Sequence, residues 1–546
     1  MKQSERPGVL STRQMLRAAG VVLLGFLASG ILGLIRTALF NSIFGASPEL
    51  EAFYAAQRIP ELLFTLVAGG ALGSSFIPVF SRFQTQGNEE HGWRLASAVM
   101  TLSALAAGVL GIILALTAPL YMPLLYNREL YQELAIHMTQ IMLLTTVIFS
   151  ISGLLMGILN THQNFLLPSL ALSMNNIGLI AGAVILAPLL STTSGIFAYP
   201  GQGTGNAASV NIYGLAIGAV LGASLHLGIQ LFGLPRIHAR LRFLPDPRVD
   251  GVWQVLTLML PRMLGLAVTQ INFMVNTAFA TTMAVGSLTV LNNAWFLMFF
   301  ALGIIAQSIG TAVFPSLSAL IAANDLEGYK DRLSTAMRSV LFLALPVTVG
   351  FIVLGQPLIA LLFERGEFTP EATAGSAWAL TFFALGIAGH SLLEVLSRAF
   401  YALSDTRTPV LIGIISMVSN IILNVIFIQF IGEPNSLARG PFAGLALANS
   451  LTTLVEAGAL WWIMRQRING IRDSYILNGA VRVLVASLGM GLAIWLLVNT
   501  FKTSGAFFTT LIGGSAGVAI FFGLALVLQL EEARTIPGVI LRRVRR

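Results

Sequence analysis

The sequence predicts an all-α polytopic membrane protein of about fourteen transmembrane helices, and three observations support this. The chain has 546 residues, of which 56% are hydrophobic, and its mean hydropathy is +0.82. Only 10% of the residues are charged, whereas soluble domains carry about 25%. The apolar runs extend over about 20 residues or more, which is the length of a membrane-spanning helix rather than of a barrel strand.

Apolar runs between polar breaks predict the helices in order along the chain. The first run, 16–44, is too long for a signal peptide and is predicted to be the first span. Short connections predict antiparallel neighbours. The connection 191–210, rich in Ser, Thr, Gly and Asn, is predicted to be a solvated outer loop. The fourteen predicted helices cover 16–44, 59–82, 94–120, 135–159, 165–190, 210–234, 252–283, 287–322, 334–363, 372–402, 409–431, 440–464, 475–500 and 506–530.

Lysine and arginine residues concentrate on one side of the predicted membrane. They gather in the N-terminal tail, in 236–248, in 465–472 and from 534 onward, whereas the opposite connections hold few. Basic connections stay on the cytoplasmic side, so both termini are predicted to be cytoplasmic. The net charge of +8 then reflects membrane topology and contact with lipid headgroups, and no nucleic-acid partner is predicted.

Several classes of enzyme and metal protein are disfavoured by the composition. The chain has no cysteine, which excludes disulfides, thiol catalysis and cysteine-bound metals. No phosphate-binding loop of the ATP-hydrolysing type is present, and the histidines have no spacing that suits a metal ion. We therefore expect no catalytic residue, no metal and no cofactor, and a protein that moves its substrate rather than converting it.

The chain also repeats itself. Gly73-Ser74-Ser75-Phe76-Ile77-Pro78 matches Gly310-Thr311-Ala312-Val313-Phe314-Pro315 at an offset of 237 residues, which places the second predicted helix on the eighth. Two pseudo-symmetric six-helix lobes and two further C-terminal helices follow. Such lobes are typical of transporters, in which the substrate binds between them. The predicted parts are 1–235 (first lobe), 236–251 (basic cytoplasmic linker), 252–470 (second lobe) and 471–546 (last two helices and a basic tail).

Arginines inside predicted spans are the leading candidates for function, because charged groups are costly in a membrane. Arg36 could contact an anion in a water-filled cavity, or form a buried ion pair with Glu51 or Glu61. Arg262 could reach the same cavity or extend to the interface. Arg58 could gate the cavity mouth or belong to a solvated helix start.

Other polar residues favour structural roles. Glu394 and Arg398 are one helical turn apart and are expected to form a structural or gating pair. The small residues from Gly69 to Ser75 predict close helix packing. A further group of asparagines could line a cavity or bond one helix to another: Asn175, Asn176, Asn276 and Asn420.

These residues give the chain a family resemblance over about 20–470. It resembles the MurJ (MviN) lipid II flippases of the multidrug/oligosaccharidyl-lipid/polysaccharide exporter superfamily. The order and spacing of several short segments carry the resemblance. They include Leu32-Gly33-Leu34-Ile35-Arg36, Arg58-Ile59-Pro60, Gly70-Ala71-Leu72-Gly73-Ser74-Ser75-Phe76-Ile77-Pro78, Pro261-Arg262-Met263-Leu264-Gly265, Leu362-Phe363-Glu364-Arg365-Gly366 and Arg398-Ala399-Phe400-Tyr401-Ala402-Leu403-Ser404-Asp405-Thr406-Arg407-Thr408-Pro409.

The resemblance implies fourteen helices, a central cavity lined by helices one, two, seven and eight, and a groove for the lipid tail on the last two. It implies that lipid II, the undecaprenyl-pyrophosphate-linked precursor of peptidoglycan, crosses the bacterial inner membrane by alternating access in support of cell-wall growth and cell shape. Arg36 would then contact the pyrophosphate, with Arg262 and Arg58 as helpers. The expected partners are lipid II, membrane lipids and other cell-wall synthesis proteins, and we expect a monomer.

The chain departs from the family pattern at several positions. The family often has arginines in helices two and eight, where this chain has Phe64 or Thr65 and Phe296. Some members hold sodium with an acidic residue of helix seven and the Asp of the Asp-Thr-x-Thr-Pro turn. Those positions are Asn276 and Asp405 here, so a cation site at these two residues and coupling to sodium or protons stay open.

Three other functions remain. The chain could export another polyprenyl-linked oligosaccharide, or act as a cation-coupled drug antiporter, or serve as a non-transporting scaffold of envelope synthesis. A drug antiporter would need an acidic residue within the membrane, which this sequence hardly supplies. Loss of function after Arg36→Ala would favour transport over a scaffold.

Overall fold

The computed structural model describes residues 12–68, 71–191, 210–500 and 505–534, and their regular structure is entirely helical. The predicted outer loop 191–210 and the basic tails lie almost wholly outside these residues. Gly69 and Gly70 of the small-residue stretch lie outside them as well, and the side chains from Ala71 to Ser74 are not described. The predicted fold class, an all-α polytopic membrane protein, is confirmed.

By length and composition, eleven helical segments of the described chain could cross a membrane. The number is up to twelve if α14 (Pro370–Leu385) and α15 (Ile387–Ala402), which are bent by 44°, form one span. Helix α10 (Val252–Thr281) and the broken segment from α2 (Pro48–Leu63) to α3 (Ala71–Thr85) are not among them. If α10 and the segment from α2 to α3 each cross the membrane as well, the twelve spans become the predicted fourteen. The count of fourteen stays a prediction.

The chain forms two compact units, Met1–Ala278 and Phe279–Arg546. Helix α10 therefore belongs mostly to the first unit, although the repeat assigns it to the second lobe. The lobes are defined by sequence repetition and the units by packing, so the predicted lobe boundaries stay a prediction. The helices of the first unit besides α2, α3 and α10 are α1 (Thr12–Phe44), α4 (Glu89–Leu125), α5 (Gln132–Met142), α6 (Leu144–Thr161), α7 (Leu166–Ala181), α8 (Ala187–Ser191) and α9 (Tyr213–Leu231), with the short turns η1 (Phe64–Ala68), η2 (Glu129–Tyr131), η3 (Gly182–Leu186) and η5 (Pro235–Ile237).

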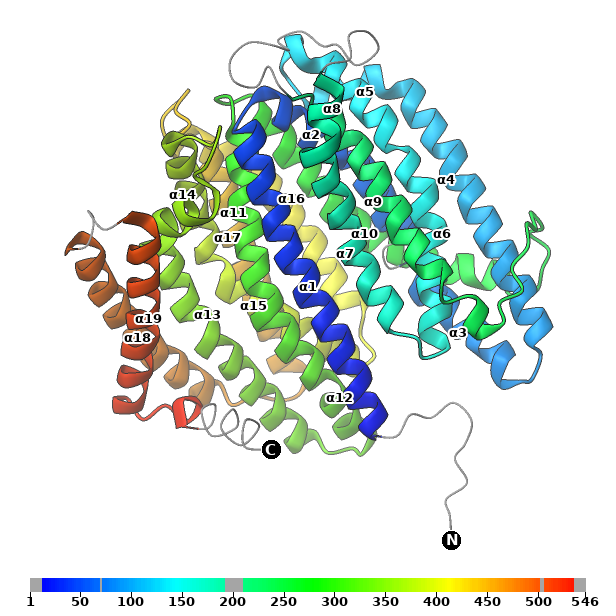
Figure 1. The fold of residues 1–546 in the computed structure, drawn as a ribbon. Coiled ribbons are helices and arrows are strands. Elements are labelled where there is room, and N and C mark those ends of the chain that lie inside the picture. The colour runs from blue at the N-terminus through cyan, green and yellow to red at the C-terminus, as the bar shows by residue number, and fades with distance from the viewer. Residues whose placement is uncertain (1–11, 69–70, 192–209, 501–504, 535–546) are drawn as a thin grey trace. The chain divides into compact units, whose positions relative to one another are not determined.

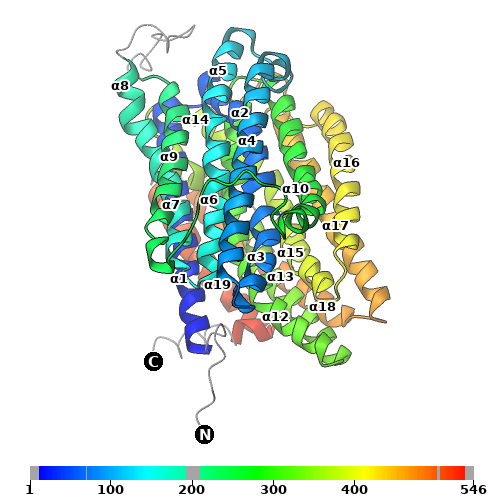
Figure 2. The ribbon, with the colours of Figure 1, turned by 90° about the vertical axis from the view of Figure 1, so that its right-hand side faces the viewer.

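The second unit holds the remaining helices, and α16 and α17 lie side by side in it (Figure 2). Besides α14 and α15, its elements are α11 (Ser287–Leu302), η6 (Gly303–Gln307), α12 (Ser308–Ala322), α13 (Leu326–Phe363), α16 (Arg407–Phe430), α17 (Phe442–Arg467), α18 (Asp473–Thr500) and α19 (Gly505–Val527). The last two, α18 and α19, pack on α13 (Figure 1).

The second predicted helix begins earlier than expected, at Pro48 rather than residue 59. The Ser47 hydroxyl accepts a hydrogen bond from the Leu50 N–H at 3.3 Å, and Pro48 occupies the first turn. Glu49 and Glu51 also lie in that turn, where acidic side chains favour a helix start. These polar residues resemble a loop in a hydropathy profile, which explains the wrong boundary.

The internal repeat has a structural counterpart in each unit. Helices α2 and α11 are both 16 residues long, and each continues into a π-helical segment of five residues, η1 and η6. In a π-helical segment the hydrogen bonds span five residues instead of four, which interrupts the regular α-helical pattern and bends the helix. Such segments are frequent at functional positions. Because both units carry this break before the repeated sequence, the repeat extends to the local backbone.

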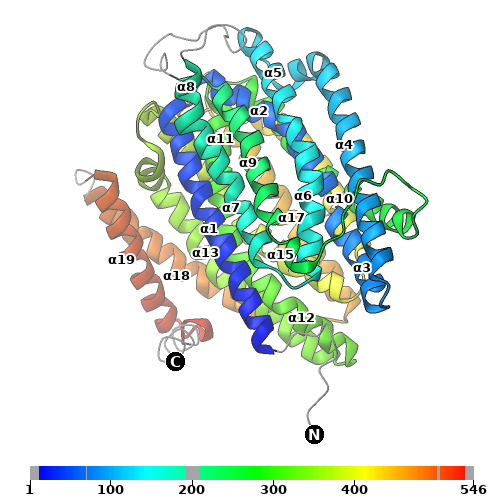
Figure 3. The same cartoon turned by 45° about the vertical axis from the view of Figure 1, so that its right-hand side comes forward.

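Glycines allow the closest packing described in the first unit, between α9 and the segment formed by α7 and η3. A Cβ atom added to Gly178 would lie 2.2 Å from the Cα of Gly222, and one on Gly182 would lie 2.8 Å from the Cα of Gly218. Helices α1, α7 and α9 lie side by side (Figure 3). Such small-residue contacts let helix backbones approach in a membrane, where apolar burial gives little driving force.

Candidate functional site

Arg36 lies on α1 and contacts α7. Its Nη1 donates a hydrogen bond to Asn176 Oδ1 at 3.0 Å, and Asn176 Nδ2 donates to the Ser29 carbonyl at 3.2 Å. The guanidinium also lies 5.9 Å from the ring centre of Phe40. Its Nε is buried and has no hydrogen-bond partner among the described residues. A buried donor of this kind carries a desolvation cost that an anionic ligand would offset.

An ion pair between Arg36 and Glu51, one of the alternatives considered above, does not form. Glu51 is fully buried and binds Arg128 instead, with Nε and Oε2 2.7 Å apart. Glu61, the other alternative, lies within electrostatic reach of Arg36 without a direct ion pair among the described contacts. The direct partner of Arg36 is therefore a neutral amide, which leaves its positive charge uncompensated at contact distance.

Arg58 connects α2 to α10 within the first unit. Its Nε donates to Thr277 Oγ1 at 2.9 Å, and its Nη1 lies 3.3 Å from Glu61 Oε2. The guanidinium stands 5.5 Å from the ring centre of Phe273. Its side chain is only 13% exposed. Because α2 begins at Pro48, Arg58 lies within the helix, and the interpretation as a solvated helix start is wrong.

The two arginines share surroundings. The Tyr54 hydroxyl interacts electrostatically with both Arg36 and Arg58, and Glu61 interacts with Arg36 while it pairs with Arg58. Among the described interactions, Glu61 is the carboxylate that acts on both guanidiniums, so the three groups together carry a net positive charge. Arginine forks match phosphate oxygens in geometry and charge, so this arrangement can bind a phosphate group.

The positions where the family often has arginine are apolar or neutral here. Phe64 packs on Phe149 with ring centres 4.6 Å apart. Thr65 accepts a hydrogen bond from Gln270 Nε2 at 2.9 Å, which joins η1 to α10. Phe296 lies on α11 and is half-buried. Arg262 lies on α10, but its side chain lies outside the described residues, so its role stays a prediction.

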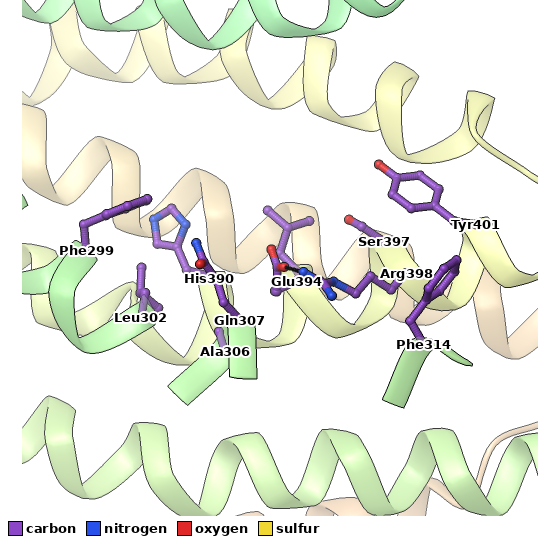
Figure 4. Close-up of a pocket in the computed structure, with 11 residues that line it drawn as sticks. Phe299, Leu302, Ala306, Gln307, Phe314, His390, Glu394, Ser397, Arg398 and Tyr401 are labelled. Atoms are coloured by element: carbon purple, nitrogen blue, oxygen red, sulfur yellow. Dashed lines mark hydrogen bonds and ion pairs between the residues drawn. The ribbon is translucent and has the colours of Figure 1, made fainter. Parts of the chain in front are cut away.

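A cavity of about 540 Å³ lies within the second unit, between α11, η6, α12 and α15. Figure 4 shows Glu394 and Arg398 near its middle, with Phe299 and His390 toward one end and Tyr401 and Phe314 toward the other. Arg398 Nε donates to Glu394 Oε1 at 3.0 Å, and its Nη1 donates to Thr311 Oγ1 at 2.8 Å. The ion pair is present, while its structural or gating role stays a prediction.

The residues proposed for a cation site lie in different units. Asn276 Nδ2 donates to Asn272 Oδ1 of the same helix at 3.0 Å. Asp405 accepts from the backbone N–H groups of Arg407 and Thr408 at 3.0 Å each, and it pairs with Arg467. Burial would raise the pKa of Asp405, but hydrogen bonds from Thr408 and Arg467 outweigh it and lower the pKa to about 2. The cation site itself stays a prediction.

Sequence reasoning missed three polar residues of these helices. Thr277 and Gln270 hold α10 against α2 and η1, and neither has a sequence signal stronger than its polarity. Glu456 on α17 did have a signal, because it is the one charged residue within the predicted span 440–464. The rule that singled out the arginines, that charge inside a span points to function, applies equally to this glutamate.

The chain is similar in sequence to a known family over most of its length. The family model described as "Lipid II flippase MurJ" matches residues 40–514. The chain is 30% identical over 464 residues to the lipid II flippase MurJ of Burkholderia cenocepacia, covering 83% of this chain and 84% of the relative. It is 29% identical over 537 residues to the probable lipid II flippase MurJ of Bdellovibrio bacteriovorus, covering 95% and 96%.

Solved structures share the fold. A lipid II flippase MurJ in an inward closed conformation superposes with a TM-score of 0.75 at 26% identity, covering 93% of this chain and 98% of the other. An inward-facing multidrug resistance MATE family transporter of the MOP superfamily superposes with a TM-score of 0.64 at 16% identity, covering 81% and 94%. The second likeness concerns the fold alone.

Proposed function

The chain belongs to the lipid II flippase MurJ family, and on that premise we propose that it moves lipid II from the inner to the outer leaflet of the bacterial cytoplasmic membrane. Its polar headgroup would pass through the protein while the polyprenyl tail stays in lipid. The two units would alternate the access of the headgroup to either side, as repeated lobes do in other transporters. Both termini would lie in the cytoplasm, as the distribution of basic residues predicts.

The observation that carries this proposal, beyond family membership, is the buried Nε of Arg36 without a described hydrogen-bond partner, in an arginine that interacts with Tyr54 as Arg58 does. A pyrophosphate offers oxygens that can accept from several N–H donors at once. Arg36 would supply the free donor, and Arg58, fixed by Thr277 and Glu61, would supply a second positive charge. The headgroup would thus be gripped without the extra arginines that the family often carries.

Complementation tests this proposal. A bacterium whose own lipid II flippase can be depleted is given this gene, and growth and outward lipid II are measured. Rescue by the wild-type chain supports the function; no rescue despite normal expression and membrane insertion overturns it. Arg36→Ala is expected to abolish rescue, and Arg407→Ala, which changes an exposed arginine at the start of α16, serves as the matched control.

The same experiment separates the alternatives. A scaffold of envelope synthesis would keep its function after Arg36→Ala and lose it when cytoplasmic connections are altered. A drug antiporter would confer resistance to toxic cations without restoring outward lipid II. Such an antiporter needs an acidic residue within the membrane, which we expected the sequence hardly to supply. Glu394 and Glu456 both lie on apolar helices, so drug resistance should be measured as well.

A further inference from the structure

Glu456 lies in the middle of an apolar helix and differs from three other glutamates of the helices, each of which has a basic partner. Glu51 pairs with Arg128, Glu61 with Arg58 and Glu394 with Arg398. Glu456 forms no ion pair with any described residue. Its position is also deep: α17 runs from Phe442 to Arg467, so Glu456 lies about 21 Å from its start and about 17 Å from its end at ~1.5 Å per residue. A short carboxylate side chain cannot reach the interface from there.

The carboxyl group lies against α16 rather than standing free on the surface of α17. Its Oε1 comes within 3.4 Å of the position that a Cβ on Gly413 would take. The Ser416 hydroxyl, one turn along α16, lies close enough to interact electrostatically with this carboxyl. An ionised carboxylate held at this depth by one hydroxyl would be costly, whereas a protonated one is not.

Ser416 can serve both protonation states of this carboxyl. Its Oγ also lies 3.4 Å from the carbonyl oxygen of Thr452, which is one turn from Glu456 on α17. A hydroxyl has one proton to donate and lone pairs that accept. Next to ionised Glu456, Ser416 can donate to the carboxylate. Next to protonated Glu456, it can accept from the carboxyl O–H and turn its own proton to Thr452.

We propose that Glu456 is a proton-binding site of the second unit, and that its carboxyl between α16 and α17 takes up and releases a proton during the transport cycle. Protonation joins H⁺ to the carboxylate and removes its charge, so no other reactant is needed. The linkage of this proton to lipid II movement rests on the proposed function. The predicted coupling to sodium or protons would then be coupling to protons.

The surrounding groups favour a proton over a metal cation. Sodium needs a cage of several oxygens, whereas the contacts of Glu456 provide its own carboxyl, one hydroxyl and one backbone carbonyl. None of the other titratable side chains on α17 or on the helices packed against it contacts Glu456 by a described hydrogen bond or ion pair. They are Arg465 and Arg467 on α17, Arg407 on α16, His390, Glu394, Arg398 and Tyr401 on α15, and Glu371 on α14.

His390 is the neighbour that competes most directly with this assignment. Its Nε2 lies 3.1 Å from Asn449 Oδ1 and 3.4 Å from Thr453 Oγ1, both on α17. Thr453 is one turn from Glu456, so a proton on this imidazole would sit close to the same helix interface. The test therefore includes His390→Gln.

Two measurements on the full-length protein in lipid vesicles test the proposal. The first is a pH titration by difference infrared spectroscopy, which detects the carbonyl stretch of a protonated carboxyl without any substrate. The wild-type chain is expected to show a titrating band that Glu456→Gln loses. Glu456→Asp, which keeps a carboxyl, is expected to retain it, and so is Glu433→Gln, which changes an exposed loop carboxyl.

The second measurement follows lipid II movement in the same vesicles under an imposed pH gradient or an imposed sodium gradient. The wild type is expected to respond to pH, and Glu456→Gln to lose that response. A response that survives in Glu456→Gln but disappears in His390→Gln, or one to sodium alone, overturns the assignment. If wild-type vesicles move no lipid II under any gradient, the proposed function fails, while the infrared titration still decides whether Glu456 binds a proton.

Discussion

Arg338 on α13 forms an ion pair with Glu532, with Nε and Oε1 2.5 Å apart, and so joins α13 to the segment that follows α19. The Arg338 guanidinium also lies 4.2 Å from the ring centre of Tyr475 on α18. Gly479 leaves room for it, because a Cβ there would lie 2.7 Å from Arg338 Nε. One arginine of α13 thus contacts both α18 and the segment that follows α19.

Removing this arginine is expected to destabilise the attachment of α18 and α19. The side chains of Arg338 and Glu532 are only 8% and 11% exposed. Breaking a buried ion pair by removing one partner costs about 3–5 kcal/mol. Arg338→Ala should therefore lower the unfolding temperature of the detergent-solubilised protein by several degrees. The double change Arg338→Leu with Glu532→Leu should restore part of the loss; an equal loss in both would contradict the pairing.

The contact between α7 and α9 provides a prediction with a control on the same helix. A Cβ on Gly222 would lie 2.6 Å from the Asn175 carbonyl oxygen, whereas one on Gly228 would meet nothing within 4 Å. Gly222→Ala should therefore push the helices apart, at a cost of about 1–3 kcal/mol. Gly228→Ala should be neutral or slightly stabilising, because alanine favours a helix over glycine. Thermal unfolding of both variants measures the difference, and similar unfolding temperatures would argue against this close contact.

Much of the fold could be predicted from the sequence, because hydropathy acts locally. The predicted run 287–322 coincides with the helical segment Ser287–Ala322, and the pairing of Glu394 with Arg398 follows from their spacing of one turn. The surroundings of Arg36 could not be predicted in this way. Its partner Asn176 lies 140 residues away, and a single sequence does not record which faces of distant helices meet. Glu456 could have been found from the sequence, because a charged residue inside a predicted span points to function. That criterion was used only for the arginines.

The hydrogen bond between Arg58 and Thr277 predicts that its removal reduces transport without abolishing folding. Thr277→Val keeps the shape of the side chain and removes the hydroxyl that accepts from Arg58 Nε at 2.9 Å. A lost hydrogen bond to a charged group costs about 1.5–3 kcal/mol, so lipid II movement should fall by about tenfold or more while the protein still folds. Complementation and a vesicle assay of lipid II movement measure this.

The Thr277→Val variant also has an internal control. Thr282→Val removes an exposed hydroxyl that donates only to the Phe279 carbonyl among its described contacts, so it should leave transport unchanged. Unchanged transport in Thr277→Val as well would remove Arg58 from the binding site. Equal losses in both variants would instead point to a general defect of this helix end.

The carboxyl of Asp405 predicts a dependence of stability on pH. Its pKa is lowered from 3.8 to about 2, because hydrogen bonds from Thr408 and Arg467 outweigh the effect of burial. A group whose folded-state pKa is lowered stabilises the protein above its unfolded pKa, and the stabilisation is lost as the pH falls through the folded value.

Asp405→Asn removes this titration and still accepts hydrogen bonds at the start of α16. The wild type should therefore unfold at a higher temperature than Asp405→Asn by a constant margin between about pH 7 and about pH 5, and the margin should shrink as the pH falls from about 4 toward about 2. Other carboxyls titrate in both proteins and cancel in this difference. If the difference in unfolding temperature stays the same as the pH falls from about 4 to about 2, the negative charge of Asp405 does not stabilise the protein by its pairing with Arg467.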